Sequence, residues 1–475
     1  MDSPLAKTGP SPVTPTSSTV EANFGETLQL SAVTSQIEAD LLGSEALLDR
    51  KTGIAPDIDV RTPPRLTGRI DPSAIRVEVG LVADETNNLP PKLGPVVSTL
   101  ARSTAKATRL AAVPDKFGLK ALLTLRQGST RKEFIEVLGG TKASEEAVNR
   151  GLAWLAAHQN ADGSWSLHNF HQNCKGKHAN CSHVGSVNSD TAGTGLALLP
   201  FLAAGNKPDS GQYKKTVAAG VKWLVDHQKP NGDLFVPGTA QSWMYSHGIA
   251  SIAVCEAYAM TEDPALRDSA RKALDFIVKS QHQSSGGWRY APNQPGDTSV
   301  VGWQMMALKS GEMAGLTVPK KTLDNVARWL QSVESNKPTG GLFGYTNPSP
   351  KVAMTAEGLL CLQFMGVDRN DPRMLAGADY LASHLPDMQQ KDTSYAWYYG
   401  SQVMYHMQGK YWKAWNAAIR DLLVNSQDKT GRMAGTWQPR DQWENSGGRL
   451  YATAMKVLML EVYYRHMPLY DQLND

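Results

Sequence analysis

The chain of 475 residues lacks any apolar run of about 18 residues or more, so the sequence predicts no transmembrane helix. Its first residues, MDSPLAKTGPSP, have no apolar signal core. We therefore expect a cytoplasmic protein or one in peripheral contact with a membrane. There is no long Lys/Arg run and the net charge is only +3, which predicts no nucleic-acid partner. Four cysteines are too few for a disulfide framework.

The N-terminal part of the chain lacks Trp and Tyr. All 12 Trp and all 15 Tyr lie after Thr141. Residues 1–22 are rich in Pro, Ser and Thr, and six prolines interrupt residues 51–95. Such segments bury too little apolar surface to offset the entropy of ordering. We predict an extended, partly disordered N-terminal arm with short helices at residues 1–141, which offers a site for a protein partner. The main domain is expected at residues 142–470.

What the main domain does contain is one phrase repeated six times: an apolar helix, a turn rich in Gln and Gly, and a second apolar helix. Two clear copies of the first half are GLAWLAAHQNADGSW (151–165) and ALDFIVKSQHQSSGGW (273–288). The first helices are amphipathic, whereas the second helices are apolar nearly all round and rich in small residues. One copy cannot bury its own apolar face, so stacked copies share a core. We predict an all-α fold with charged helices outside and small-residue helices inside.

Two aspartates stand at the start of predicted inner helices. Asp190 and Asp297 share the phrase Asp-Thr-(Ala/Ser). Asp is a favoured N-cap residue, because its carboxylate accepts backbone N–H bonds at the positive end of the helix. In a ring the same position faces the centre, so both are also candidate catalytic acids. His247, near another inner-helix start, is a candidate proton shuttle, with a hydrogen bond to a neighbouring loop as the alternative.

Aromatic side chains cluster near the starts of several predicted inner helices. Their ring faces suit an apolar chain or a carbocation, although core packing is the alternative. An Arg in this position suits a carboxylate or diphosphate, with a loop salt bridge as the alternative. The candidate ligand-binding residues are Tyr245, Trp303, Trp397, Tyr398, Tyr399, Tyr451 and Arg449.

The longest connection, in the first repeat, carries a C-x3-H-x2-C-x-H pattern made by Cys174, His178, Cys181 and His183. All four side chains can bind zinc, but the spacing is not one of the familiar finger patterns. A Cys174–Cys181 disulfide, which would indicate an oxidising compartment, is preferred to zinc, and unpaired thiols stay open as a third alternative. No other cofactor is predicted.

Four turns of the main domain carry the family resemblance. They are Gln159/Gly163/Trp165, Gln228/Gly232, Gln281/Gly287/Trp288 and Gln427/Gly435/Trp437. These turns resemble the QW repeats of squalene and terpene cyclases, which also occur more loosely in protein prenyltransferase β-subunits. The sequence looks especially like the planctomycete "prenyltransferase and squalene oxidase repeat" proteins. The resemblance covers about residues 142–468 and implies an (α/α)6 toroid whose inner-helix N-termini surround an apolar pocket.

The motifs of that superfamily are incomplete in this chain. Cyclases protonate their substrate with the central Asp of DxDD, but the nearest match, QPGDTS (294–299), keeps only Asp297 and has Gly296 at the donor position. Zinc-dependent prenyltransferases need an Asp, a Cys two residues later and a distant His. Here Ser299 stands at the Cys position, and LYAT (450–453) offers no His. Neither usual reaction is expected.

The resemblance therefore implies a non-standard terpene-cyclase- or prenyltransferase-like toroid that handles a long apolar, isoprenoid-type ligand in its central cavity. If it is an enzyme, it would be a lyase, isomerase or transferase. A non-catalytic interaction scaffold is the alternative, favoured by the missing motif residues. A carbohydrate-active (α/α)6 enzyme is a further alternative, with Asp190, Asp297 and Glu357 as candidate paired carboxylates.

Overall fold

The computed structural model describes residues 126, 131, 135–136, 138–176, 180–335, 337–390, 393–466 and 469–470. All of them lie in one compact unit, Pro90–Asp475. The predicted arm at residues 1–141 falls almost wholly outside the described residues, so the arm and its boundary stay predictions.

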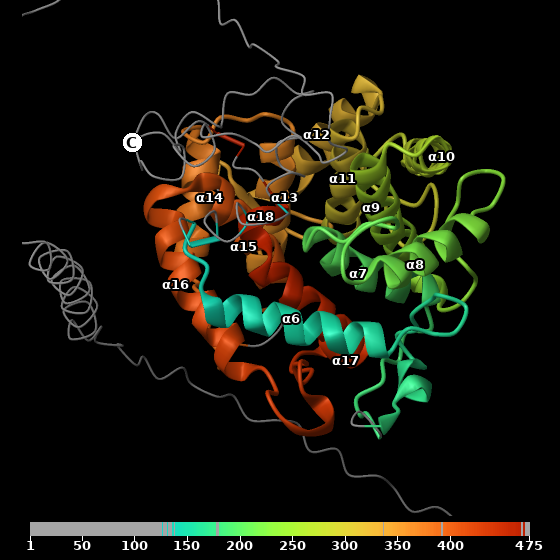
Figure 1. The fold of residues 1–475 in the computed structure, drawn as a ribbon. Helices are drawn as coiled ribbons and strands as arrows, with labels where there is room; N and C mark the ends of the chain where they lie inside the picture. The colour runs from blue at the N-terminus through green and yellow to red at the C-terminus, as the bar shows by residue number, and fades with distance from the viewer. Residues whose placement is uncertain are drawn as a thin grey trace, which may run out of the picture. The chain divides into compact units, whose positions relative to one another are not determined.

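Within the described residues, six helices form an inner layer. Each contacts the next one along the chain, and the last contacts the first, so the layer is a closed ring (Figure 1). Nearly every side chain of these helices is buried, as their all-round apolar pattern predicts. The inner helices are α7 (Asp190–Ala203), α9 (Trp243–Thr261), α11 (Thr298–Met313), α13 (Val352–Phe364), α15 (Thr393–Met407) and α17 (Gln442–Leu460).

A second set of helices surrounds this ring. Most of the outer helices pack between two inner helices, and α16 contacts α6, which joins the last repeat to the first. In Figure 1 the outer helix α6 lies across α17. The outer helices are α6 (Lys142–Ala157), α8 (Lys214–Asp226), α10 (Pro264–Ser280), α12 (Lys320–Val333), α14 (Pro372–Ala382) and α16 (Gly409–Ser426). The predicted all-α (α/α)6 toroid is thus confirmed.

The Gln of the repeated turn has a structural task that explains its recurrence. Gln159 Nε2 donates to the carbonyl of Gly163 in its own turn (2.8 Å) and to that of Thr216 in the next outer helix (2.9 Å). A buried amide that bridges two backbone carbonyls fixes the turn against the neighbouring repeat. The same pair of bonds recurs at Gln228, Gln281 and Gln427.

The Gly and Trp of the turn follow from the same packing. Gly163 has φ +97, and a Cβ there would lie 2.5 Å from the carbonyl oxygen of Ala219 in the next outer helix. Only glycine fits a positive φ pressed against backbone. Trp165 then donates its indole N–H to the carbonyl of Leu155 (2.7 Å), as Trp288 and Trp437 do in their own repeats. The repeated sequence phrase therefore encodes the joint between repeats.

Short elements complete the described structure. β1 (Glu334–Ser335) pairs antiparallel with β2 (Leu342–Phe343) in the fourth connection. The 3-10 helix η2 (Phe170–Asn173) lies in the long first connection, and α18 (Val462–Arg465) follows α17. Two further 3-10 helices are η4 (Ala240–Ser242) and η5 (Gly431–Met433). Across the described residues, no helix combines the length and apolar character needed to span a bilayer.

Candidate functional site at the inner-helix N-termini

Asp297 is the N-cap of α11 and has no exposed surface. Its Oδ1 accepts from the Val300 amide (2.9 Å) and from the Ser299 hydroxyl (3.0 Å), and its Oδ2 accepts from the Tyr345 hydroxyl (3.1 Å). Arg289 Nε lies 3.8 Å from Oδ2. Burial raises the pKa of Asp297, while the three donors and the guanidinium oppose that rise. The carboxyl is built to accept hydrogen bonds.

Two chains of hydroxyl groups end at this carboxylate. Ser299 has a single hydroxyl proton and gives it to Asp297, so Tyr245, which lies against the Ser299 hydroxyl, is the donor to Ser299. Similarly, the hydroxyls of Tyr290 and Tyr345 are 2.7 Å apart, and Tyr345 donates to Asp297. Burial raises the pKa of Tyr245 well above its usual value, so it stays a donor. Tyr245 and Tyr290 are half-buried and form the outer ends of both chains.

Glu357 in α13 is the second carboxyl group of the site and has opposite surroundings. It has no exposed surface, and neither carboxyl oxygen makes a hydrogen bond of standard geometry with the described residues. A Cβ on Gly302 would lie 2.9 Å from Glu357 Oε1 and 3.1 Å from the hydroxyl oxygen of Tyr399. Burial first, and then the charge of Asp297, raise the pKa of Glu357 well above its usual range, and Tyr399 only partly opposes this. Burial therefore favours the protonated form of Glu357.

Aromatic rings pack around these two acids. Trp303 of α11 stacks on Tyr398 (centroids 5.6 Å apart) and meets Tyr399 edge to face (5.9 Å). Its indole N–H donates to the Tyr395 hydroxyl (3.0 Å). Trp303, Tyr399 and Glu357 each have 0 % exposed surface, so no space large enough for water adjoins them. The predicted apolar hollow is filled by side chains at this level of the ring.

Two of the predicted catalytic residues lie elsewhere. His247 is buried in α9 and turns toward α10: its Nδ1 accepts from the Leu234 amide (3.1 Å), and its Nε2 donates to the Ala273 carbonyl (3.1 Å). Its Nδ1 is also 3.5 Å from Asp233. Burial favours the neutral form of Asp233, but hydrogen bonds with His247 and Lys229 prevail and lower its pKa to about 2. His247 thus has the loop-bonding role that was the alternative.

Asp190 is the first residue of α7, whereas Ser189 is the N-cap and accepts from the Ala192 amide (3.1 Å). The prediction that Asp190 caps this helix is wrong, because the preceding hydroxyl takes that position. Asp190 Oδ1 is buried without a hydrogen-bond partner among the described residues.

The remaining predicted ligand-binding residues form hydrogen bonds within the protein or are almost fully buried. Trp397 donates to Gln390 (3.2 Å), the Tyr398 hydroxyl accepts from Arg465 (3.0 Å), and Tyr451 is 7 % exposed. Arg449 follows a kink in α17 at Gly448 and is almost fully buried.

Arg449 is occupied by loop contacts. It donates to Thr436 (2.8 Å), to Asp428 (3.2 Å) and to the Ser182 carbonyl (3.2 Å). These bonds join the last turn to the long first connection, which is the loop role that was the alternative to ligand binding.

The structure brings together only the two cysteines of the predicted metal-binding pattern. Cys174 and Cys181 both lie beside His158, which the sequence pattern did not include. His183 is exposed, and its Nδ1 lies 3.1 Å from Arg449 Nη2. His178 lies outside the described residues.

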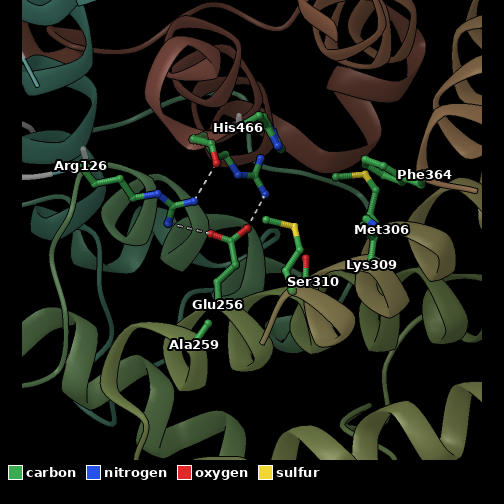
Figure 2. Close-up of a pocket in the computed structure, with 10 residues that line it drawn as sticks. Arg126, Glu256, Ala259, Met306, Lys309, Ser310, Phe364 and His466 are labelled. Carbon is green, nitrogen blue, oxygen red and sulfur yellow. Dashed lines mark hydrogen bonds and ion pairs between the residues drawn. The ribbon is translucent and has the colours of Figure 1, made fainter. Parts of the chain in front are cut away.

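The other end of the inner helices holds a small cavity with a charged side and an apolar side (Figure 2). There Glu256 pairs with Arg126 (3.3 Å) and with Arg465 (3.0 Å), and Arg126 also donates to the Arg465 carbonyl (2.8 Å). Lys309 and His466 also line the cavity, and Met306 and Phe364 contribute to its apolar side. The cavity measures about 50 Å³, which is room for a few water molecules.

Sequence reasoning left several functional groups out of the candidate set. Tyr345 reaches Asp297 from the following connection, Ser299 lies two residues after it, and His158 belongs to a turn that repeats in the second unit. Glu357 was considered only as a possible glycosidase carboxylate, although it is the only charged residue in the apolar run VAMTAEGLLCLQF (352–364). Such a residue in a helix buried all round indicates a function or a partner.

Comparison with known proteins gives one family match. Residues 133–238 match the family described as "Squalene-hopene cyclase C-terminal domain". This match confirms the resemblance to the terpenoid cyclase superfamily over that part of the chain, which includes the first repeat. Closeness to the planctomycete proteins stays a prediction. A search of curated proteins found no significant match to this chain.

Solved structures with a similar chain fold include a terpene cyclase, a mannanase and a further protein. The apo type II terpene cyclase MstE from Scytonema is 14% identical over 70% of this chain and 100% of its own, with a TM-score of 0.46. The GH76A alpha-1,6-mannanase from Salegentibacter sp. HEL1_6 is 10% identical over 67% of this chain and 98% of its own, with a TM-score of 0.47. A protein from Actinoplanes is 16% identical over 68% and 99%, with a TM-score of 0.42. We draw no conclusion about chemistry from similarities of this size.

Proposed function

Starting from the squalene-hopene cyclase likeness of residues 133–238, we propose that the toroid is a non-standard, terpene-cyclase-like enzyme that protonates an apolar, isoprenoid-type substrate. The single observation that carries the proposal is the fully buried carboxyl group of Glu357, whose pKa burial raises, beside the hydrogen-bonded carboxyl of Asp297. The sequence lacks the usual donor at Gly296, and in the proposal Glu357 supplies the proton from α13 instead.

The two carboxyl groups have the complementary surroundings that acid chemistry needs. Among the described residues, Glu357 has no cation in contact and no hydrogen-bond donor of standard geometry, so burial favours its protonated form. Asp297 has three donors and Arg289, which favour its ionised form. A pair of acids whose environments separate their pKa values divides into a proton donor and a charged partner.

In the proposed step the Glu357 proton moves to a carbon of a C=C bond or to an epoxide oxygen. The O–H bond of Glu357 breaks. On an alkene, the π electrons form the new C–H bond; on an epoxide, an oxygen lone pair forms the new O–H bond, and the C–O bond breaks with its electrons going to oxygen. Positive charge then develops on the substrate, where the faces of Trp303 and Tyr399 and the negative charge of Asp297 stabilise it. Loss of a proton from the cation restores the acid, so the product is an isomer of the substrate.

Access requires movement at the rim, because the space around Glu357 is filled. Tyr245 and Tyr290 are the half-buried residues of the hydroxyl chains, and their rings are 6.1 Å apart. In the proposal these side chains separate when the substrate enters. Peripheral contact with a membrane would deliver such a lipid, and a protein partner for the N-terminal arm stays a prediction.

The test is a product search with a matched variant. The purified full chain is extracted and analysed by mass spectrometry for bound isoprenoids, and is then incubated with polyprenyl alcohols, squalene and its epoxide. We expect an isomer of one substrate from the wild type and none from Glu357→Gln, which keeps the shape but cannot donate an acidic proton. Glu312→Gln, a partly exposed residue of α11, should retain turnover. Equal turnover in Glu357→Gln, or neither ligand nor product in the wild type, would reject the proposal.

A non-catalytic scaffold is the second candidate, and the filled ring favours it. Asp297→Ala separates the two functions. In a scaffold it removes an N-cap, with a loss on the order of 1 kcal/mol in unfolding free energy and no other effect. In an enzyme it also abolishes turnover. Glycan cleavage is less well supported, since paired glycosidase carboxyls must reach a solvated substrate, whereas Asp297 and Glu357 have no exposed surface.

A further inference from the structure

Three side chains of the first repeat converge in a way that neither the proposed acid chemistry nor the family likeness explains. His158 follows α6, Cys174 follows η2, and Cys181 lies further along the same connection. His158 Nε2 is 3.1 Å from Cys181 Sγ and 3.4 Å from Cys174 Sγ, and the three atoms lie within 4.8 Å of one another. Elsewhere in the described part of the chain, no other set of three His, Cys, Asp or Glu side chains meets this condition.

The histidine is oriented as a metal ligand. Its Nδ1 is 2.7 Å from the Trp154 carbonyl oxygen, which can only accept, so Nδ1 carries the proton and the lone pair of Nε2 faces the two thiols. The ring stacks on Trp154 (centroids 3.8 Å apart) and is fully buried. A carbonyl that fixes the tautomer and turns the other nitrogen toward the ligand site is typical of zinc-binding histidines.

The second repeat shows which part of this arrangement belongs to the fold. His227 stacks on Trp223 (4.3 Å), and its Nδ1 is 2.8 Å from the Trp223 carbonyl oxygen, the same geometry as at His158. The described contacts of His227 include no thiol. Stacking and the Nδ1 bond are therefore structural features of the repeat, while the two cysteines facing Nε2 are an addition of the first repeat.

We propose that His158, Cys174 and Cys181 bind a Zn²⁺ ion. Thiolate sulfur and imidazole nitrogen suit zinc, with Zn–S of about 2.3 Å and Zn–N of about 2.0–2.1 Å. Tetrahedral angles at those lengths separate the ligand atoms by roughly 3.5–3.8 Å, close to the spacings in the structure. Both thiols lose their protons to solvent on binding, and three protein ligands leave the fourth position to water.

Zinc at this position would fix the long first connection at a second point. The far side of that connection is already held by Arg449, whose side chain donates to the Ser182 carbonyl and whose backbone amide donates to the His183 carbonyl (2.8 Å). The proposed ion attaches the near side to the end of α6. The site is independent of the acid at Glu357, so failure of either proposal leaves the other standing.

The experiment measures zinc in the purified full chain by elemental analysis, after loading with ZnSO₄ and dialysis against buffer. We expect about one zinc per chain. The thermal midpoint should fall when a chelator removes the metal. Replacement by Co²⁺ should give a thiolate-to-metal charge-transfer band, which reports cysteine ligation directly.

Variants separate ligands from bystanders. His158→Ala and His227→Ala each remove an equivalent stacked ring and an equivalent Nδ1 hydrogen bond. Only His158→Ala should lower the zinc affinity, by tenfold or more. Cys174→Ser should also lose the metal and the Co²⁺ band. His183→Ala should keep both, because that side chain contacts Arg449.

Three results would overturn the proposal. The first is a wild-type chain that holds no zinc after loading. The second is a mass two units below the reduced value with no free thiol at Cys174 or Cys181, which would assign a disulfide. The third is equal zinc loss in His227→Ala or His183→Ala, which would show that the metal depends on fold integrity or on other ligands.

Discussion

The two ends of the inner ring hold buried carboxyl groups in contrasting surroundings. At the C-terminal end of α9, Glu256 lies between the guanidinium groups of Arg126 and Arg465. At the N-terminal rim, Glu357 is buried more completely and has no cation in contact. Burial alone penalises the charged form of both. The partners therefore distinguish the two acids, and the one without a cation in contact is the proposed proton donor.

The largest expected effect comes from breaking the paired end. Glu256→Gln removes the carboxylate that pairs with both Arg126 and Arg465, and we expect the unfolding free energy to fall by about 3–5 kcal/mol. Urea unfolding followed by circular dichroism measures it. A loss well under 1 kcal/mol would mean that the two guanidinium groups are neutralised or solvated in another way.

The same end contains a histidine that resists protonation. Burial, and then the charge of Lys309, lower the pKa of His406 to about 3. In the unfolded chain His406 takes up a proton below about pH 6.5, so between pH 6.5 and 3 the unfolded state binds more protons and stability falls as the pH is lowered. At pH 5 protonation of His406 in the unfolded chain lowers the unfolding free energy by about 2 kcal/mol. His406→Leu should lose less stability than wild type between pH 7 and 5 in parallel urea titrations.

The bare end should respond to pH in the opposite sense. Burial raises the pKa of Glu357, so above about pH 4.5 the unfolded chain releases a proton that the folded protein keeps, and stability falls as the pH rises. Glu357→Gln removes this term and should be more stable than wild type at pH 7, by about 1.4 kcal/mol for each unit of pKa shift. The difference should shrink toward pH 4. A destabilised variant at pH 7 would indicate that Glu357 is ionised.

The smallest effect is expected where solvent replaces burial. Lys320 and Asp324 form an ion pair on the exposed face of α12, with both side chains mostly in water (86 % and 59 % exposed). Water and salt screen such pairs, so Asp324→Asn should leave the unfolding free energy unchanged within error. A clear loss of stability in Asp324→Asn would contradict the view that burial of the ion pairs causes the effect of Glu256→Gln.

Much of the fold was predictable because each joint between repeats is made by residues of one short, recurring sequence phrase. Gln159 and Gly163 contact the next outer helix and Trp165 contacts its own, and the three lie within a single turn. The inner layer was also predictable, because helices that are buried on all sides need small and apolar residues along their whole length. The six-repeat toroid follows from these two patterns.

The site was less predictable because its residues come from different repeats, whose relative positions depend on how the repeats pack around the ring. Asp297 was identified as a cap, but its partner Tyr345 lies in the following connection, and the acid Glu357 comes from the next inner helix. His158 was missed because it looks like every other turn histidine until the folded connection brings Cys174 beside it. Distances between repeats are set by loop lengths and packing, which a single sequence does not encode in a short pattern.

The bond from Gln427 to the carbonyl of Ala147 ties the sixth repeat to the first. A linear array of repeats has two exposed ends and frays from them, whereas this closed array has none. Removing any one unit would break two joints instead of one, so partial unfolding gains little. The toroid should therefore melt as one cooperative block.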